Sequence, residues 1–498
     1  MFVKLKSAFV FGINAYGVEV EVDSSKGLPA FVIVGLADNA IKESKERVRS
    51  ALLNSSIPFK ATRLTVNLSP ADVKKEGSQF DLPIAIAIAI VNGVEISKNL
   101  EEFLFAAELS LDGKLRPVSG ILPISIHAKK HNLNLVVAKE NAYEASLAKA
   151  SIYAFDNLSQ VLGFLNGYVD AKLYEANIVF EKVDYEVDFS EIKGQHRAIR
   201  AALIAASGFH NIMLIGPPGT GKSMLAQRIP TIMPPMSEEE IIETTKIYSV
   251  AGLSKGSVIT KRPFRAPHHT ASDISLIGGG ADAKPGEISL AHNGVLFLDE
   301  LPEFKRNVIE VLRQPLENGY INVSRAKFTV NYPANFMLIG AANPCPCGYY
   351  GSKVKKCTCS FDQIRRYRSK ISGPFLDRID LYVEMPEIDY DIIQAESTYT
   401  SYDLMQKVIE AREFQKNRFF EEKIKTNSQL TPRLIKKYCK LDFQAEQTLK
   451  QAMKVLHFSA RSYTKVLKVA RTIADLAKSD IILDSHIKEA ISYRYVEN

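Results

Sequence analysis

The stretch Asn211-Ile-Met-Leu-Ile-Gly-Pro-Pro-Gly-Thr-Gly-Lys-Ser223 decides the fold of this chain. An apolar strand leads into a glycine-rich loop, and a run compatible with a helix follows. The loop consists of Gly216, Pro217, Pro218, Gly219, Thr220, Gly221, Lys222 and Ser223. Such a loop curls its backbone N–H groups around phosphate oxygens, and the helix N-terminus adds a positive dipole end. The pattern predicts an ATP site in which Lys222 reaches the β and γ phosphates and Ser223 ligates Mg²⁺.

A second apolar strand, Gly294–Leu298, ends in the two carboxylates Asp299 and Glu300. Parallel sheets bring the carboxyl ends of their strands to one edge, so we expect this pair beside the phosphate loop. Asp299 would hold the water shell of Mg²⁺, which leaves Glu300 to orient and deprotonate the attacking water. The pair is common as an isolated pattern, but behind a phosphate loop it predicts ATP hydrolysis.

Three further polar residues are candidates for contact with the γ-phosphate. A third apolar strand, Asn335–Ala342, ends at Asn343, whose amide can hydrogen-bond the attacking water. The alternative is a turn asparagine before a proline. Arg378 and Arg461, the latter at a predicted helix start, offer forks that bind two phosphate oxygens and offset the charge of phosphoryl transfer. Taken alone, either arginine is typical of a surface ion pair.

The length and the distribution of segments predict several domains. The 498 residues exceed one hydrophobic core, and 46% hydrophobic with 24% charged residues is ordinary for a globular protein. Strand-like and helical segments alternate over 1–168, a polar stretch over 169–188 indicates a linker, and apolar strands alternate with helices over 189–385. Residues 386–498 are mainly helical. We therefore predict an α/β protein with an N-terminal α/β domain, a central parallel sheet flanked by helices, and a C-terminal helical lid.

The run Ile84–Ile90 is ambiguous. Its strict alternation of isoleucine and alanine has period two and by itself predicts a strand. Asp81 and Pro83 before it are typical of a helix start, and Asn92-Gly93 after it of a helix end. We therefore expect a buried helix.

The sequence predicts neither a secretory signal nor a membrane span. Lysines interrupt the apolar N-terminal stretch, and the longest apolar run, 82–91, is about half of the ~20 residues that a span needs. The net charge of +7 permits polyanion binding without requiring it. The predicted location is the cytoplasm, with no membrane partner.

Four of the five cysteines form two Cys-x-Cys pairs. Four thiolates in a tetrahedron bind Zn²⁺, so structural zinc is predicted at Cys345, Cys347, Cys357 and Cys359. Free thiols and a redox pair are the alternatives, because Cys-x-x-Cys is the more usual spacing. Cys439 is expected to be buried. His268 and His269 precede a glycine-rich segment and are assigned to a moving loop rather than to a metal site.

Together these motifs resemble the magnesium-chelatase and minichromosome-maintenance branch of AAA+ ATPases and, across nearly the whole chain, the ComM/YifB family. The most specific segments are Phe189-Ser-Glu-Ile-Lys-Gly-Gln-His, Arg262-Pro-Phe-Arg-Ala-Pro-His-His-Thr, Pro285–Glu300, Asn343-Pro-Cys-Pro-Cys-Gly and Ser459-Ala-Arg-Ser-Tyr. The resemblance implies that Asn343 is the first sensor and that Arg461 is the second sensor in the lid. It implies that Arg378 is an arginine finger acting on a neighbouring subunit, and that Ile192 and Gly194 flank the adenine.

The same resemblance implies an assembly and a substrate. A finger acting in trans requires a ring, and the class implies a homo-hexamer. The implied activity is ATP-dependent branch migration of DNA during natural transformation. Residues 317–330 predict a hairpin, which in the resembled branch projects into the pore of the ring. Arg325 and Lys327 at its tip would hold a phosphate backbone, with contacts that weaken as salt rises; the alternative is a solvated basic turn.

The N-terminal part also resembles the proteolytic domain of Lon proteases, in the segments Lys74–Pro83 and Glu108–Gly120. A Ser-Lys dyad would need a serine where Gln79 stands and a lysine where Ile121-Leu-Pro-Ile stands, and the adjacent Ser78 has no base beside it. We predict a non-catalytic platform for ring assembly or partner docking. A Lon-like ATPase that processes a protein, or a chelatase-like motor that remodels one, is the rival class of function.

Overall fold

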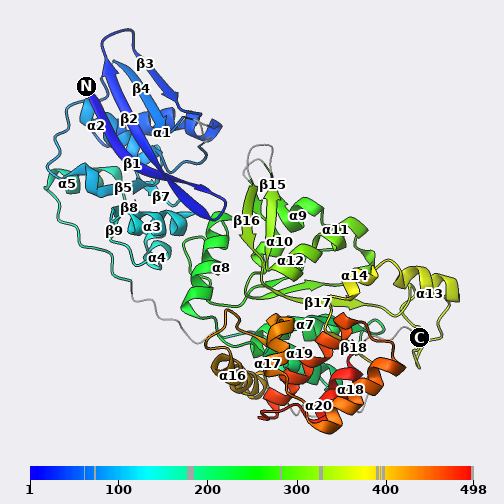
Figure 1. Cartoon of the computed structure of the whole chain (residues 1–498). Coiled ribbons are helices and arrows are strands. Elements are labelled where there is room, and N and C mark those ends of the chain that lie inside the picture. The colour runs from blue at the N-terminus through cyan, green and yellow to red at the C-terminus, as the bar shows by residue number, and fades with distance from the viewer. Residues whose placement is uncertain are drawn as a thin grey trace.

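The computed structural model describes all residues except 37, 61, 72–74, 177–183, 281–282, 325–328, 389–391, 393, 395–398 and 495–498. Two large sheets organise the described chain, one in the N-terminal part and one in the centre, and the C-terminal helices lie beneath the central sheet (Figure 1). Within the described residues, no helix is both long enough and apolar enough to cross a membrane.

The N-terminal sheet has seven strands in the order β3-β4-β2-β1-β5-β8-β9. Its strands are β1 (Phe2–Phe11), β2 (Asn14–Ser25), β3 (Ala30–Val34), β4 (Arg63–Ser69), β5 (Phe103–Ala106), β8 (Asn134–Ala138) and β9 (Ile152–Phe155), and β6 (Glu108–Leu109) pairs separately with β7 (Leu115–Arg116). The helices are α1 (Asn39–Asn54), α2 (Asp81–Val91), η1 (Leu100–Glu102), α3 (Ile121–Lys130), α4 (Lys139–Ser146) and α5 (Leu158–Asn166). β1 pairs antiparallel with β2 and parallel with β5, so the sheet is mixed.

The isoleucine–alanine run forms helix α2, as the flanking residues predict. All residues of α2 except Ile90 are buried. The helix therefore has no polar face from which its period of 3.6 residues could be recognised in the sequence. Asp81 in the first turn is fully buried and pairs with Arg47 at 2.7 Å. The residues that flank the run therefore predicted the helix correctly, and the alternation within the run did not.

The central sheet has the order β11-β14-β17-β10-β18, and every neighbouring pair is parallel. Its strands are β10 (Ile212–Ile215), β11 (Phe264–Arg265), β14 (Val295–Leu298), β17 (Met337–Ala342) and β18 (Leu381–Glu384). The helical segments around it are η2 (Phe189–Glu191), α6 (His196–Gly208), α7 (Lys222–Ile232), α8 (Glu238–Val250), α9 (Asp273–Ile277), α10 (Glu287–Leu290), η3 (Leu301–Glu303), α11 (Arg306–Val311), α12 (Arg313–Asn318), α13 (Phe361–Arg368) and α14 (Gly373–Leu376). Strands buried on both faces explain the continuous apolar runs in the sequence.

Two short antiparallel pairs accompany the central sheet. They are β12 (Gly278–Gly279) with β13 (Lys284–Pro285), and β15 (Tyr320–Ser324) with β16 (Thr329–Pro333). The second pair supplies the two strands of the expected hairpin. Its predicted DNA-contact residues, Arg325 and Lys327, lie outside the described residues.

The C-terminal part is helical, as predicted. It comprises α16 (Ser401–Arg418), η4 (Asn427–Gln429), α17 (Pro432–Tyr438), α18 (Phe443–Val455), α19 (Ala460–Leu476) and α20 (Asp484–Ser492). Apolar residues of these helices and of the central sheet belong to one continuous core. The structure thus has the predicted α/β architecture, with a parallel central sheet flanked by helices and a helical C-terminal region.

The N-terminal part packs directly on the central part. Leu122 and Leu147 share an apolar cluster with Met236 and Ile241 of the α8 region. Ser254 Oγ donates to the buried carboxylate of Glu144 at 2.7 Å. In Figure 1 the end of the β1–β2 hairpin also meets β16, and a Cβ added to Gly12 would lie 2.4 Å from Val330 Cγ1.

Candidate nucleotide site and cysteine cluster

The glycine-rich loop encloses open space between β10 and α7. Gly219 and Gly221 have φ of +80° and +87°, a left-handed conformation that glycine adopts without a steric penalty. A Cβ added to either glycine would meet no atom within 4 Å. At Gly216, by contrast, a Cβ would lie 2.4 Å from the carbonyl oxygen of Met385. The loop is therefore fixed at its start and open where a phosphate group would bind.

A cavity of about 390 Å³ lies at this loop, at the carboxyl ends of β10, β14 and β17. It is lined by Pro218, Gly219, Thr220, Gly221, Lys222, Ser223, Met224, Asp299, Glu300 and Asn343. The predicted residues of three separate motifs thus share one cavity. Its floor includes the N-terminus of α7, whose free N–H groups favour an anion.

Lys222 is folded onto the loop. Its Nζ donates to the carbonyl oxygens of Gly216 at 2.6 Å and Pro217 at 2.9 Å, and to Asn343 Oδ1 at 3.2 Å. Burial lowers its pKa, while the charges of Asp299 and Glu300 act in the opposite direction. An incoming phosphate would give this buried ammonium an anionic acceptor.

Ser223 and Asp299 offer oxygen ligands side by side. Ser223 Oγ donates to Asp299 Oδ2 at 2.7 Å, and the backbone N–H of Glu300 donates to Asp299 Oδ1 at 2.9 Å. Mg²⁺ prefers a hydroxyl or carboxylate oxygen together with water and phosphate oxygens. The donor set therefore fits the cation that an ATP site requires.

Glu300 has an unusual backbone. Its φ and ψ are +49° and +46°, a conformation that costs a non-glycine residue on the order of 1–2 kcal/mol. It directs an exposed carboxylate to the mouth of the cavity, where His269 Nδ1 lies 3.7 Å from Glu300 Oε2. Strained residues cluster at functional sites. Sequence reasoning assigned His269 to a moving loop and did not anticipate this contact.

Ile192 and Gly194, predicted to flank the adenine, are tied to the loop by a residue that the prediction omitted. Gln195 Nε2 donates to the carbonyl oxygens of Thr220 at 3.2 Å and Pro386 at 2.8 Å. Ile192 is buried, and Gly194 has φ of +66°. The only signal for Gln195 was its place in the segment Lys-Gly-Gln-His.

Neither predicted arginine lines the cavity as described. Arg378 forms an ion pair with Glu317, and its guanidinium donates to the carbonyl oxygen of Pro374. Arg461 Nη1 lies 3.6 Å from a carboxylate oxygen of Asp377, the residue beside Arg378. Arg461 therefore contacts the residue that precedes Arg378 in the chain, and neither arginine lines the described cavity of its own chain.

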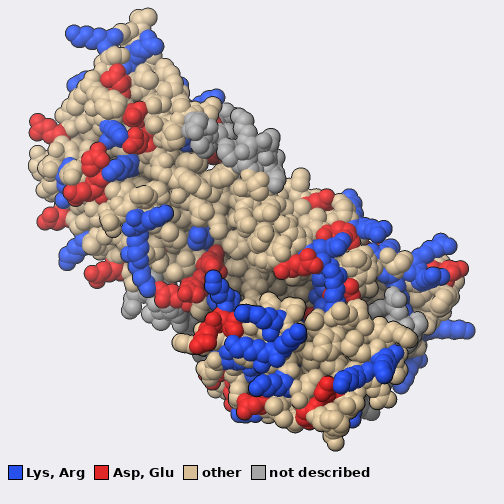
Figure 2. Space-filling model, in the orientation of Figure 1, with Lys and Arg blue, Asp and Glu red and all other residues tan. Residues whose placement is uncertain are grey.

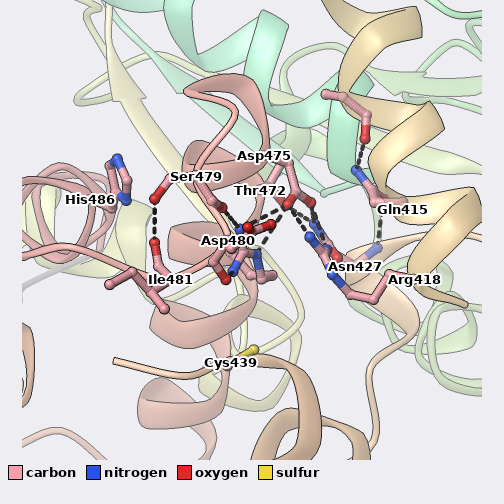
Figure 3. A network of polar contacts seen from close by, with 12 residues as sticks. Gln415, Arg418, Asn427, Cys439, Thr472, Asp475, Ser479, Asp480, Ile481 and His486 are labelled. Carbon is pink, nitrogen blue, oxygen red and sulfur yellow. Dashed lines mark hydrogen bonds and ion pairs between the residues drawn. The ribbon is translucent and has the colours of Figure 1, made fainter. Parts of the chain in front are cut away.

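The helix that begins near Arg461 is anchored by buried polar residues (Figure 3). In α19, Asp475 accepts hydrogen bonds from Arg418 at 2.5 Å and from Asn427 at 2.8 Å, and it pairs with the fully buried Arg471 at 3.0 Å. Thr472 Oγ1 contacts His210 Nε2 of the central part at 2.8 Å. These contacts fix α19 against the rest of the lid and against the start of β10.

The four clustered cysteines come together as predicted. Their sulfur atoms all lie within 4.8 Å of one another. Cys345 Sγ is 3.3 Å from Cys347 Sγ and 3.7 Å from Cys357 Sγ. A tetrahedral zinc site with Zn–S bonds of about 2.3 Å has sulfurs roughly 3.8 Å apart. Hydrogen bonds from backbone N–H groups, that of Tyr349 first, lower the pKa of Cys347 to about 5. The pKa of Cys357 is raised, because the hydrogen bond from the backbone N–H of Cys359 is outweighed by burial and the neighbouring thiols. The cluster therefore fits Zn²⁺. Cys439 is buried separately, as expected.

The cysteine cluster adjoins the nucleotide cavity. It follows Asn343 directly in the chain, and a Cβ added to Gly348 would lie 2.8 Å from Pro218 Cδ. Glu387 holds the outer loop by accepting hydrogen bonds from Ser352 Oγ at 2.7 Å and from the backbone N–H of Lys353 at 3.1 Å. The loop between the cysteine pairs is thus attached to the strand β18 side of the site.

Comparison with known proteins identifies the family. The family described as "Magnesium chelatase, subunit ChlI" matches residues 188–393, "Subunit ChlI of Mg-chelatase" matches 20–141, and "Magnesium chelatase, subunit ChlI C-terminal" matches 398–494. Competence protein ComM of Haemophilus influenzae is 44% identical over 491 residues, 97% of this chain and 95% of that protein. The chain belongs to the ComM/YifB family. YifB of Escherichia coli, an uncharacterized protein, is 42% identical over 98% of this chain and 96% of its own length.

Within the ComM/YifB family this chain retains the magnesium-chelatase-like AAA+ architecture. A more distant relative, the magnesium-chelatase 38 kDa subunit of Cereibacter sphaeroides, is 25% identical over 174 residues, 31% of this chain and 52% of that protein. This relative thus matches a smaller part of the chain than the three family matches cover together.

The N-terminal part of this ComM/YifB chain presents Ser78 to a carboxylate. Ser78 Oγ donates to Glu108, and Gln79 Nε2 donates to the carbonyl oxygen of Glu76 at 2.8 Å. Ile121 and the three residues after it form the buried start of α3. A serine becomes nucleophilic when a neighbouring base takes its proton. The expectation that no base lies beside Ser78 is therefore wrong, because the Glu108 carboxylate accepts its hydrogen bond. This partner is a carboxylate and not the lysine of a Lon-type Ser-Lys dyad.

Proposed function

We propose that this chain is an ATPase that assembles into a homo-hexameric ring and drives branch migration of DNA in natural transformation and recombination. The observation that carries the proposal is the single cavity shared by Lys222, Ser223, Asp299, Glu300 and Asn343. The relative named competence protein supports the biological setting. The proposed location is the cytoplasm.

In the proposed reaction, the phosphates of ATP occupy the cavity with Lys222 between the β and γ groups. Bound Mg²⁺, held through Ser223 and Asp299, supplies neutralisation of phosphate charge. Glu300 orients a water molecule toward the γ phosphorus and accepts its proton, and Asn343 holds that water or a γ oxygen by its amide. Ile192 and Gly194 flank the adenine.

The positions of the arginines support a composite site. Neither Arg378 nor Arg461 lines the described cavity of its own chain, and Arg461 contacts Asp377, the residue before Arg378. We propose that both act on the nucleotide of a neighbouring chain, where their forks offset the charge of the transferring phosphate. Each chain then contributes its phosphate loop to one nucleotide site and its arginines to another. Hydrolysis therefore depends on assembly.

The DNA contact is proposed at the β15–β16 hairpin, through Arg325 and Lys327. The proposed division of the chain is a platform over 1–168, a linker over 169–188, a motor over 189–385 and a lid over 386–498. Structural Zn²⁺ is proposed at the four clustered cysteines, whose sulfurs lie within 4.8 Å of one another.

A second function is a motor that remodels a partner protein. The observation in its favour is that all three matching families are magnesium-chelatase subunits. Such a motor would share the nucleotide site and differ in what the ring moves.

The deciding experiment measures the ATPase rate of the full chain at low salt, without DNA and with a branched DNA. Strong stimulation, abolished in Arg325→Ala, supports the DNA motor, and the Glu300→Gln variant should hydrolyse nothing in either condition. Basal hydrolysis without any stimulation would overturn the DNA motor in favour of protein remodelling.

A further inference from the structure

Positive charge is concentrated on the segment that carries the cysteine cluster. Between Tyr349 and Arg368 the sequence holds six basic residues and one acidic residue, a net of plus five in a chain whose total is +7. The basic residues are Lys353, Lys355, Lys356, Arg365, Arg366 and Arg368. Figure 2 shows Lys and Arg gathered at the end of the molecule where Figure 1 places α13. We call this surface, residues 349–368, the basic surface of the cysteine module.

These cations are accessible. All six residues are exposed to solvent. Across the described part of the chain, the side-chain cations of Lys353, Lys355, Lys356, Arg365 and Arg366 have no carboxylate within ion-pair distance, although Glu387 accepts a hydrogen bond from the backbone N–H of Lys353. Elsewhere on the molecule the opposite arrangement occurs, for example where Lys437 pairs with Glu422 at 3.0 Å. Self-repulsion on such a surface is relieved by a polyanion.

Aromatic rings lie among the cations. Phe361 is 76% exposed and Tyr350 is 46% exposed, and both are large apolar groups left in water. Lys355 Nζ lies 4.6 Å from the ring centre of Tyr349, and the Arg368 guanidinium lies 5.4 Å from that of Tyr350. Single-stranded nucleic acids are bound by this combination, in which cations follow the backbone and aromatic rings stack on unpaired bases.

We propose that the basic surface of the cysteine module binds single-stranded nucleic acid, as a site separate from the β15–β16 hairpin. The proposal rests on the proposed function in one respect, since it assumes that the motor acts on DNA. Unpaired cations favour any polyanion, and the exposed Phe361 selects for unstacked bases over duplex. Gly348, the residue before this surface, packs closely on Pro218 of the phosphate loop, so the surface begins next to the nucleotide site.

The test measures fluorescence anisotropy of a labelled thymidine oligonucleotide and of a duplex with the full-length chain. The charge variant carries Lys355→Ala, Lys356→Ala, Arg365→Ala and Arg366→Ala. Its matched control carries four exposed lid lysines without an ion pair among the described residues, as Lys407→Ala, Lys416→Ala, Lys436→Ala and Lys454→Ala. We expect at least roughly tenfold weaker binding for the charge variant alone. The slope of its affinity against salt should fall by about 0.7 for each phosphate that the surface no longer neutralises.

The ring variant tests the preference for single strands. Phe361→Ala should weaken binding of the oligonucleotide by roughly fivefold or more and binding of duplex far less. Phe443→Ala is its control, because Phe443 is 77% exposed and also occupies the first position of a capped helix. Equal effects of the two substitutions would contradict base stacking at the module.

The outcomes separate this inference from the proposed function. No DNA binding by the unaltered chain at low salt would end both. DNA binding and DNA-stimulated hydrolysis that the charge variant retains would overturn only the second site, and would leave the surface to an acidic protein. The inference also fails if the charge variant loses zinc or its oligomeric state, since the cations would then serve the cluster or the assembly.

Discussion

Lys222 of the phosphate loop donates a hydrogen bond to Asn343 Oδ1 at 3.2 Å, across 121 residues of sequence. The contact joins the start of α7 to the end of β17, which lies next to β10 in the sheet although the two strands are distant in the chain. It fixes which end of the Asn343 amide faces the lysine and leaves the amide N–H₂ for the cavity. We expect nucleotide binding to rearrange this pair, because a phosphate would offer the ammonium an anionic acceptor.

Asn343→Ala should therefore lower the turnover number by about a hundredfold, the usual effect of removing one donor that acts on a transition state. Nucleotide affinity should change little, because Lys222 and the loop N–H groups remain. Steady-state hydrolysis and binding of a fluorescent ATP analogue measure the two quantities. A large loss of affinity with an unchanged turnover number would contradict a role in the chemical step.

Glu300→Gln should abolish measurable hydrolysis, a loss of about 10²–10⁴-fold, while ATP still binds, because the amide cannot accept a proton from water. Glu303→Gln is the matched control, since Glu303 is the next acidic residue and pairs with Lys370 at 3.1 Å outside the cavity. Single-turnover hydrolysis distinguishes the two. Similar losses in both variants would remove Glu300 from the role of base.

Mixing two inactive variants tests the arginine finger. Arg378→Ala chains keep an intact cavity, and Lys222→Ala chains keep an intact Arg378, so mixed rings should recover part of the activity that neither variant has alone. Arg461→Ala should behave like Arg378→Ala in this assay, because Arg461 contacts Asp377, the residue that precedes Arg378. Recovery for Arg378→Ala without recovery for Arg461→Ala would assign Arg461 to the nucleotide of its own chain.

The cysteine cluster should hold one zinc ion per chain, measured by elemental analysis of the purified protein. Cys357→Ser should lose the metal, because three thiolates remain, whereas Cys439→Ser should retain it, since Cys439 is buried elsewhere. A strong chelator should lower the unfolding temperature of the unaltered chain. Metal-free protein of unchanged stability would favour free thiols.

The buried network of the lid should be costly to break. Asp475→Ala leaves the fully buried Arg471 without its carboxylate and should destabilise the lid by about 3–5 kcal/mol. Glu410→Ala breaks an exposed ion pair, in which the side chain of Glu410 is 53% exposed and that of Lys478 is 60% exposed. This substitution should lower the free energy of unfolding by at most about 1 kcal/mol. Hydrogen exchange of α19 amides measures both values. Equal losses of stability in the two variants would mean that the buried pair of Asp475 and Arg471 contributes no more than an exposed ion pair.

The motifs could be predicted from sequence because each joins a strand end to a polar group. Lys222, Asp299 and Asn343 needed only the rule that parallel strands deliver their carboxyl ends to one edge. The four cysteines needed only their spacing. These predictions depend on local sequence plus one topological rule, and the structure brings the residues together.

Contacts between distant segments could not be predicted in this way. Nothing in the segment around His269 points to Glu300, and the pairing of Arg461 with Asp377 depends on how the lid lies against the sheet. The period-two alternation of Ile84–Ile90 was likewise uninformative, since a wholly buried helix needs no polar face. The tip of the hairpin, with Arg325 and Lys327, stays a prediction.

The contact between Gly348 and Pro218 has a thermodynamic consequence. If a strand bound to the cysteine module shifts the phosphate loop and so alters the affinity for ATP, then ATP must alter the affinity for the strand by the same factor. One glycine, with φ of +87° and no space for a Cβ, would then be where the two equilibria are coupled. The affinity for the strand would then change whenever ATP binds or is hydrolysed, without further residues to couple the two sites.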